Sequence, residues 1–189
     1  MPDGSDAGHA RATTLLTLPN VITFARLCMV PMAVWFVLEH GLIEAFFVFV
    51  AAGLSDALDG WLARRNGGGN LVGALMDPVA DKALLVSMYV TLAAVGELPD
   101  WLTILVVFRD LVIVGGVIVL SVLGLPVVIR PLYVSKLNTA LQIVLVAVTL
   151  LLAGYGLDAP LAKQALIWVV GATTFCSGAA YVWKAARDR

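Results

Sequence analysis

The sequence predicts an all-α integral membrane protein with six transmembrane helices and a polar cavity facing the cytoplasm. Hydrophobic residues make up 61% of the 189 residues, whereas charged residues make up only 13%. The mean hydropathy of +0.97 is too high for a soluble domain of this size, whose surface needs far more charge. Six apolar runs, each near the ~20 residues that cross a bilayer, are separated only by short connectors.

Each predicted span is an apolar run bounded by turn-forming or charged residues. In chain order the spans are 21–38, 42–63, 71–95, 101–123, 134–154 and 161–183. Turn residues mark the connectors at 39–41, 66–70, 96–99, 124–131 and 154–160. No connector is long enough to hold a further domain. We therefore expect residues 18–189 to form one six-span domain, preceded by a short cytoplasmic tail at residues 1–17.

The distribution of Lys and Arg predicts the orientation of these spans, because cytoplasmic connectors are enriched in both. The opposite connectors are acidic and contain only Lys163. With both termini in the cytoplasm, one side collects Arg11, Arg26, Arg64, Arg65, Arg130, Lys136, Lys184, Arg187 and Arg189. The tail lacks the apolar core of a signal peptide, so a bacterial plasma (inner) membrane is the expected location. The charge pattern suggests no nucleic-acid partner.

Ionisable residues interrupt the second predicted span in the segment SDALDGWLARR. A charge at the bilayer centre costs about 2.5–3.5 kcal/mol or more, so such residues face a partner or a wet cavity. At helical spacing, one face of the span carries two carboxylates, two small residues and a guanidinium. These residues are Asp56, Asp59, Gly60, Ala63 and Arg64.

The third predicted span adds two more carboxylates in the segment LVGALMDPVADKALL. Asp77 and Asp81 are four residues apart and project from the same side of a helix. Four converging carboxylates repel one another unless a cation compensates, and their oxygens suit magnesium, calcium or manganese. Small residues such as Gly73 let a phosphorylated ligand approach closely, and Arg64 suits a phosphate. The pattern therefore predicts a metal-assisted site for a nucleotide diphosphate.

The spacing Asp56-x2-Asp59-Gly60-x2-Ala63-Arg64-x8-Gly73-x3-Asp77-x3-Asp81 resembles, at every fixed position, the signature of the CDP-alcohol phosphatidyltransferase family. The six-span layout and the opening LPNVITFARL (Leu18 to Leu27) are also similar to that family. The resemblance implies that an alcohol attacks the β-phosphorus of CDP-diacylglycerol and that CMP leaves. It further implies a homodimer embedded in membrane lipid.

The resemblance also assigns roles to the motif. The metal, Mg²⁺ or Mn²⁺, is expected on Asp56, Asp59, Asp77 and Asp81, and Asp81 is expected to be the catalytic base that takes the proton of the acceptor hydroxyl. The binding residues expected for the CDP-lipid are Asn20, Thr23, Asp56, Gly60, Ala63, Arg64 and Gly73. A base within reach of the incoming hydroxyl is what this transfer needs.

The acceptor alcohol is predicted from the later charged residues. Arg109 and Lys136 are expected to face the same cavity, and two cations there suit a phosphate-bearing acceptor. The segments DPVADKALLVSMYVTL, FRDLVIVGGV and RPLYVSKLNTALQIVLVAVTLL are similar to the cardiolipin synthase branch, which uses phosphatidylglycerol. The runner-up is phosphatidylglycerophosphate synthase, which uses glycerol 3-phosphate.

Simpler interpretations stay open for several residues. Arg109 with Asp110 also fits a buried structural ion pair, and Lys136 also fits an anchor at the start of its span. Lys82 fits either an ion pair or catalysis, and Asn20 is also an ordinary helix cap. A different class of protein, an ion-coupled transporter, also uses carboxylates within the membrane, but the later half of the chain has no matching acidic set.

Overall fold

The part of the chain that the structure describes forms six α-helices. The computed structural model describes residues 18–65, 71–122 and 133–187, with side chains described over 25–55, 82–115, 133–180 and at Trp183. The helices are α1 (Leu18–Leu38), α2 (Leu42–Arg65), α3 (Leu71–Ala94), α4 (Asp100–Val122), α5 (Tyr133–Gly154) and α6 (Pro160–Arg187). The described residues thus confirm the predicted helices, with ends shifted by a few residues.

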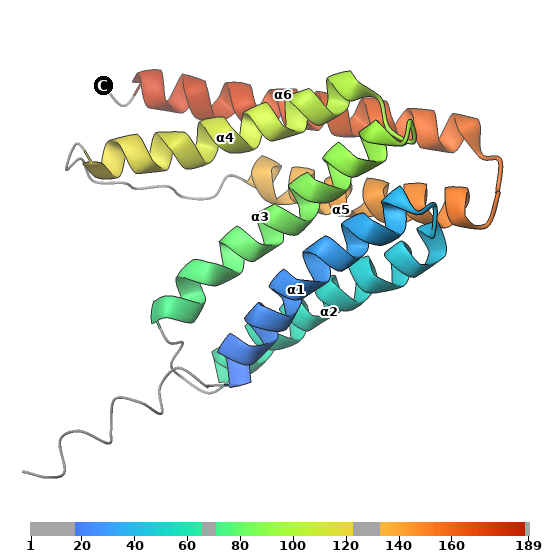
Figure 1. Cartoon of the computed structure of the whole chain (residues 1–189). Coiled ribbons are helices and arrows are strands. Elements are labelled where there is room, and N and C mark those ends of the chain that lie inside the picture. The colour runs from blue at the N-terminus through green and yellow to red at the C-terminus, as the bar shows by residue number, and fades with distance from the viewer. Residues whose placement is uncertain (1–17, 66–70, 123–132, 188–189) are drawn as a thin grey trace, which may run out of the picture.

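Three tight turns join the helices at one end of the molecule, at the right of Figure 1. His40 (φ 59°), Gly96 (φ 81°) and Gly156 (φ 61°) each adopt a left-handed conformation there. In each turn an amide closes the helix by donating to a carbonyl five residues back, as from Gly41 N to Phe36 O at 2.8 Å and from Leu157 N to Leu152 O at 2.8 Å. The turn residues in the sequence therefore predicted these connections correctly.

The packing order places α1 against both α2 and α3, while α5 lies against α2 and α6 and α4 lies against α3 and α6. Away from the three turns the helices spread, so that the ends of α1, α2 and α3 lie apart from those of α4 and α6 (Figure 1). The connectors predicted at 66–70 and 124–131 and the predicted tail at 1–17 lie outside the described residues.

A continuous apolar core lies near the turn end of the bundle. Its fully buried members come from all six helices, and the largest are Val37, Met88, Tyr89, Leu92, Leu102, Val106, Leu145, Val146, Leu150 and Val170. Close packing of this core fixes the helix arrangement from which the opposite, motif-bearing ends extend.

The described residues contain one helix, Tyr133–Gly154, that is long and apolar enough to cross a membrane. Shorter apolar stretches lie within three other helices, at Ala25–Leu38, Leu42–Ser55 and Lys82–Ala94. The predicted all-helical architecture is confirmed for the described residues.

Candidate active site

The residues of the aspartate motif fall on two consecutive helices. The last turns of α2 contain Asp56, Asp59, Gly60, Ala63 and Arg64, and the first turns of α3 contain Gly73, Asp77 and Asp81. The C-terminal end of α2 and the N-terminal end of α3 lie at the same end of the bundle (Figure 1). The side chains of these residues lie outside the described part of the structure. The motif is therefore placed by its helices alone.

The two polar residues predicted at the start of the first span lie in the first turns of α1. Asn20 and Thr23 are helical, and their side chains also lie outside the described set. One turn further on, the described side chain of Arg26 is buried, with only 1% exposed. The N-terminal half of α1 therefore contains a buried guanidinium, and its N-terminal end lies at the same end of the bundle as the C-terminal end of α2 (Figure 1).

An ion-pair cluster includes Lys82, the residue that directly follows Asp81 of the motif. Asp110 of α4 accepts hydrogen bonds on both carboxylate oxygens, from Lys82 Nζ to Oδ2 at 2.6 Å and from Arg109 Nη1 to Oδ1 at 2.7 Å. The Arg109 and Asp110 side chains are 3% and 7% exposed, whereas that of Lys82 is 33% exposed. The predicted alternative of a buried Arg109–Asp110 ion pair is confirmed, and Lys82 forms an ion pair.

Arg109 also reaches two further helices. Its Nη2 donates to Ser135 Oγ on α5 and, at 2.8 Å, to Ser177 Oγ on α6. Together with Lys82 on α3 and Asp110 on α4, these contacts join four helices at one point. We call Lys82, Arg109, Asp110, Ser135 and Ser177 the four-helix cluster. It holds two cations and one anion, with both charged members of α4 almost completely buried.

A second polar group lies beside this cluster, between α5 and α6. The side-chain oxygen of Asn138 accepts hydrogen bonds from Thr173 Oγ1 and Thr174 Oγ1, both at 2.9 Å. Gln142 Nε2 donates to Thr174 Oγ1 at 3.3 Å. Asn138, Gln142 and Thr174 are fully buried, so these bonds are made away from solvent and fix the register of α5 against α6.

Sequence reasoning did not single out these buried polar residues. The signal is present in α5, where Ser135, Asn138, Gln142 and Thr149 recur at intervals of three, four and seven residues, which places them along one helix face. A polar stripe within an apolar helix predicts a face turned toward other helices. The structure places this stripe inward, with Asn138, Gln142 and Thr149 all fully buried.

The two residues predicted to bind the acceptor lie in different surroundings. Arg109 is buried and engaged within the four-helix cluster, whereas Lys136 at the start of α5 is exposed. Lys136 follows Ser135, so the cluster extends to within one residue of it along the chain. Of the two predicted acceptor residues, therefore, Lys136 is exposed and Arg109 is enclosed by the protein.

The described side chains contain no group of three or more His, Cys, Asp or Glu residues that could hold a metal. The four aspartates of the motif are not among those side chains. Their chemistry fits a hard divalent cation, because all four are carboxylates and their helix ends lie at the same end of the bundle. The donor set of the motif is thus compatible with Mg²⁺ or Mn²⁺.

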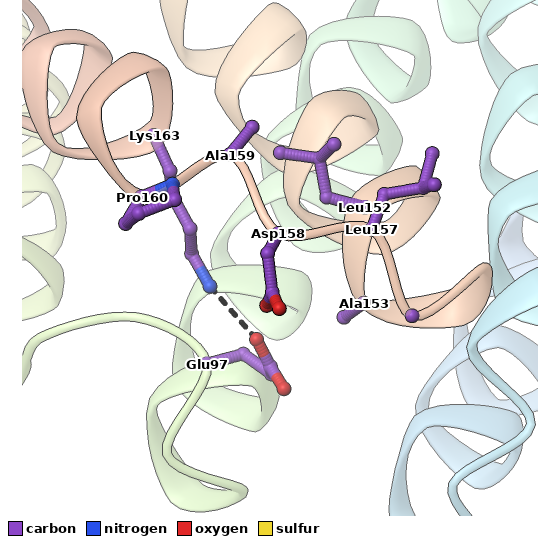
Figure 2. A pocket seen from close by; sticks show the side chains of 9 residues that line it. Glu97, Leu152, Ala153, Leu157, Asp158, Ala159, Pro160 and Lys163 are labelled. Carbon is purple, nitrogen blue, oxygen red and sulfur yellow. Dashed lines mark hydrogen bonds and ion pairs between the residues drawn. The ribbon is translucent and has the colours of Figure 1, made fainter.

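A shallow pocket lies at the opposite end of the molecule, between the α3–α4 and α5–α6 turns. Figure 2 shows Lys163 pointing toward Glu97, with which it forms an ion pair at 2.8 Å, and Asp158 lying next to them. This pocket contains none of the motif residues or members of the four-helix cluster. The candidate active site is therefore the motif-bearing end and not this pocket.

Comparison with known proteins gives one family and several relatives. The family model described as CDP-alcohol phosphatidyltransferase matches residues 16–176. A cardiolipin synthase (CMP-forming)/mitochondrial hydrolase fusion protein from Schizosaccharomyces pombe is 33% identical over 88% of this chain and 31% of its own length. A chloroplastic CDP-diacylglycerol–glycerol-3-phosphate 3-phosphatidyltransferase from Oryza sativa is 33% identical over 88% of this chain and 56% of its own length.

A bacterial relative aligns over more of its own length. The probable phosphatidylglycerophosphate synthase of Mycobacterium tuberculosis is 34% identical over 98% of this chain and 88% of its own length. By contrast, the chain spans between about a third and just over half of the length of the S. pombe and O. sativa relatives. The matched family region includes the whole motif, the polar group between α5 and α6, and every member of the four-helix cluster except Ser177.

Proposed function

Because the chain belongs to the CDP-alcohol phosphatidyltransferase family and is a transferase, we propose that it moves a phosphatidyl group from CDP-diacylglycerol to phosphatidylglycerol, giving cardiolipin and CMP. The placement of the motif on the ends of α2 and α3, which lie together at one end of the bundle, carries the proposed phosphatidyl transfer. The similarity to cardiolipin synthases carries the proposed acceptor. The same family membership favours an enzyme over the ion-coupled transporter.

In this proposal the aspartates of the motif hold the substrate diphosphate through a divalent metal. Asp56, Asp59, Asp77 and Asp81 supply carboxylate oxygens to Mg²⁺ or Mn²⁺. The bound metal would supply charge neutralisation for the oxygens that attack and leave the phosphorus. The pocket for the cytidine and the phosphates would be formed by Asn20, Thr23, Asp56, Gly60, Ala63, Arg64 and Gly73.

The transfer itself requires one bond to form and one to break at the β-phosphorus. The acceptor oxygen bonds to this phosphorus, its proton passes to the Asp81 carboxylate, and the phosphorus–oxygen bond to CMP breaks with its electron pair leaving on CMP. Lys136, which is exposed at the start of α5, would attract the phosphate of the acceptor. The acceptor contact predicted for Arg109 competes with its bonds to Asp110, Ser135 and Ser177.

The distribution of polarity on α4 supports a membrane setting. Large apolar side chains are exposed along one face of α4 at Ile104 (68%), Phe108 (63%) and Leu111 (65%), whereas Arg109 and Asp110 of the same helix are buried. A helix that exposes apolar side chains and buries charged ones within the bundle is suited to contact membrane lipid. We therefore propose six spans in a bacterial inner membrane, a polar cavity at the motif end facing the cytoplasm with both termini, and a homodimer.

A second acceptor is favoured by a specific observation. The M. tuberculosis relative, a probable phosphatidylglycerophosphate synthase, aligns over 88% of its own length, whereas the S. pombe cardiolipin synthase fusion aligns over 31%. This difference supports glycerol 3-phosphate as the alternative acceptor. Both acceptors present a phosphate and a primary hydroxyl, so the same aspartate motif would serve either one.

A product assay distinguishes these possibilities. Purified full-length chain in detergent would receive CDP-diacylglycerol, a divalent metal and either phosphatidylglycerol or glycerol 3-phosphate, and the lipid product would be identified by mass spectrometry. Cardiolipin supports the first proposal, and phosphatidylglycerophosphate supports the alternative. Absence of CMP release with every metal and acceptor, in wild type and Asp81→Asn alike, would overturn both.

A further inference from the structure

Asp110 has a geometry that the transfer reaction described above does not use. Each of its carboxylate oxygens accepts from a different cation, Lys82 Nζ at 2.6 Å and Arg109 Nη1 at 2.7 Å. Its side chain is 7% exposed, so it lies too deep to act as an open ligand site. A buried carboxylate shared by two cations fixes the position of both.

Stability alone does not account for this arrangement. Taking two charges out of water costs several kcal/mol per ion, and a buried pair is often no more stable than apolar residues of the same size. The described cluster also keeps one positive charge in excess, since it contains Lys82, Arg109 and a single carboxylate. Charges within an apolar helix bundle commonly mark a functional site.

The cluster connects the two parts of the proposed site. At one end, Lys82 directly follows Asp81, the proposed base on α3. At the other end, Ser135 directly precedes Lys136, the exposed cation at the start of α5. Adjacent Cα atoms are ~3.8 Å apart, so each end of the cluster lies one peptide unit from a residue of the proposed chemistry.

Arg109 is suited to hold the start of α5 at a fixed distance from α4, which Asp110 in turn joins to Lys82 of α3. Its planar guanidinium is held by Asp110 on its own helix, Ser135 on α5 and Ser177 on α6. Such a fork has few alternative orientations once three partners engage it. A shift in Asp110 therefore moves both the start of α5 and the segment of α3 that follows the motif.

We propose that Asp110 is a positioning residue that, through Lys82 and Arg109, holds the acceptor-side start of α5 at a fixed distance from the motif-bearing start of α3. This inference rests on the proposed function, because it assigns the base to α3 and the acceptor cation to α5. A misplacement of about 1 Å between reacting groups lowers a rate by about 100-fold. Loss of this bridge therefore affects turnover and acceptor use more than it affects CDP-diacylglycerol binding.

Two variants and one matched control test the proposal. Asp110→Asn keeps the shape of the side chain and removes its charge, and Ser135→Ala removes one contact of Arg109 without changing any charge. The control is Thr103→Val, which removes the buried bond from Thr103 Oγ1 to Tyr89 O at 3.2 Å. This bond also joins α4 to α3, but it lies about two turns of α4 from Asp110.

The kinetic readout compares the change in KM for the acceptor with the change in KM for CDP-diacylglycerol. For Asp110→Asn we expect kcat to fall about 10- to 100-fold, with a raised KM for the acceptor and an unchanged KM for CDP-diacylglycerol. Ser135→Ala is expected to show the same split with a smaller loss, about tenfold or less. Thr103→Val is expected to keep all three constants. Wild-type constants in Asp110→Asn, or an equal rise of both KM values, would overturn the inference.

Hydrogen exchange supplies a readout that does not depend on activity. In the purified full-length chain, Asp110→Asn is expected to raise amide exchange in the first turns of α3 and α5 together, and Thr103→Val is expected to leave those segments unchanged. If wild type releases no CMP but this exchange pattern is observed, the proposed function fails and the positioning role holds. If the exchange in α3 and α5 is unchanged, the positioning role is refuted even in an active enzyme.

Discussion

The shared carboxylate of Asp110 predicts an asymmetric response to removal of its two partners. Lys82→Met removes a side chain that is 33% exposed and leaves Asp110 bonded to Arg109 at 2.7 Å. Partly exposed ion pairs contribute little, so we expect a loss of about 1 kcal/mol in the free energy of unfolding. Asp110→Asn instead leaves the guanidinium of Arg109, 3% exposed, without its counter-ion. Breaking a buried pair in this way costs about 3–5 kcal/mol.

The double variant tests whether the two residues act together. Once Asp110 is neutral, Lys82 only repels Arg109, so adding Lys82→Met is expected to cost nothing further. The coupling free energy between the two substitutions is therefore expected to be about 1 kcal/mol. The double variant should lose less unfolding free energy than the two single variants lose together. The assay is titration with SDS in mixed micelles, followed by circular dichroism.

A matched pair at the other end of the molecule serves as the control. Lys163 and Glu97 are joined at 2.8 Å, and their side chains are 24% and 30% exposed. Because both partners are similarly exposed, Lys163→Met and Glu97→Gln are expected to cost similar amounts, each about 1 kcal/mol or less. Equal costs for Lys82→Met and Asp110→Asn, or strict additivity in the double variant, would refute the reasoning about a shared carboxylate.

Three further predictions concern the site and the packing. Asp56→Ala and Asp81→Asn are each expected to abolish CMP release without lowering the free energy of unfolding, and wild-type turnover of either variant would contradict the site assignment. Removal of divalent metal with EDTA is expected to stop CMP release, and added Mg²⁺ or Mn²⁺ is expected to restore it; full activity in EDTA would exclude a metal requirement. Gly154→Ala places a Cβ 2.7 Å from Ile43 Cγ1 and 3.1 Å from Ile43 N. It is expected to cost about 1–3 kcal/mol of unfolding free energy, whereas Gly115→Ala, with nothing within 4 Å, is expected to cost none.

The helices were predictable because their signal is local. Apolar runs separated by the predicted connectors 39–41, 96–99 and 154–160 correctly predicted the order and approximate ends of α1 to α6. The errors are small and occur at termini, since α1 begins at Leu18 and not at residue 21, and α6 continues to Arg187. Helix ends depend on caps and neighbouring turns, which hydropathy does not report.

The partners of the buried charges were less predictable, because they are set by tertiary packing. Lys82 forms an ion pair with Asp110, 28 residues further along the chain, and Arg109 donates a hydrogen bond to Ser177, 68 residues further along. The sequence left Arg109 open between a structural ion pair and an acceptor contact, and only the packing of α4 between α3 and α6 brings its partners together. The roles of the motif residues Asp56, Asp59, Asp77 and Asp81 stay predictions, supported by the family match.

The position of the charged groups along the helices follows from the cost of burying them. Near the three tight turns the core is apolar, and the described charged pair there, Glu97 with Lys163, lies at the surface. Toward the other end, Arg26, Arg109 and Asp110 are buried within helices whose outer faces are apolar. Buried charges in such a bundle need partners, and for Arg109 these are Asp110, Ser135 and Ser177. The buried charges at this end are therefore compatible with the proposed site, in which the aspartate motif would hold a metal and the phosphates of the CDP-lipid.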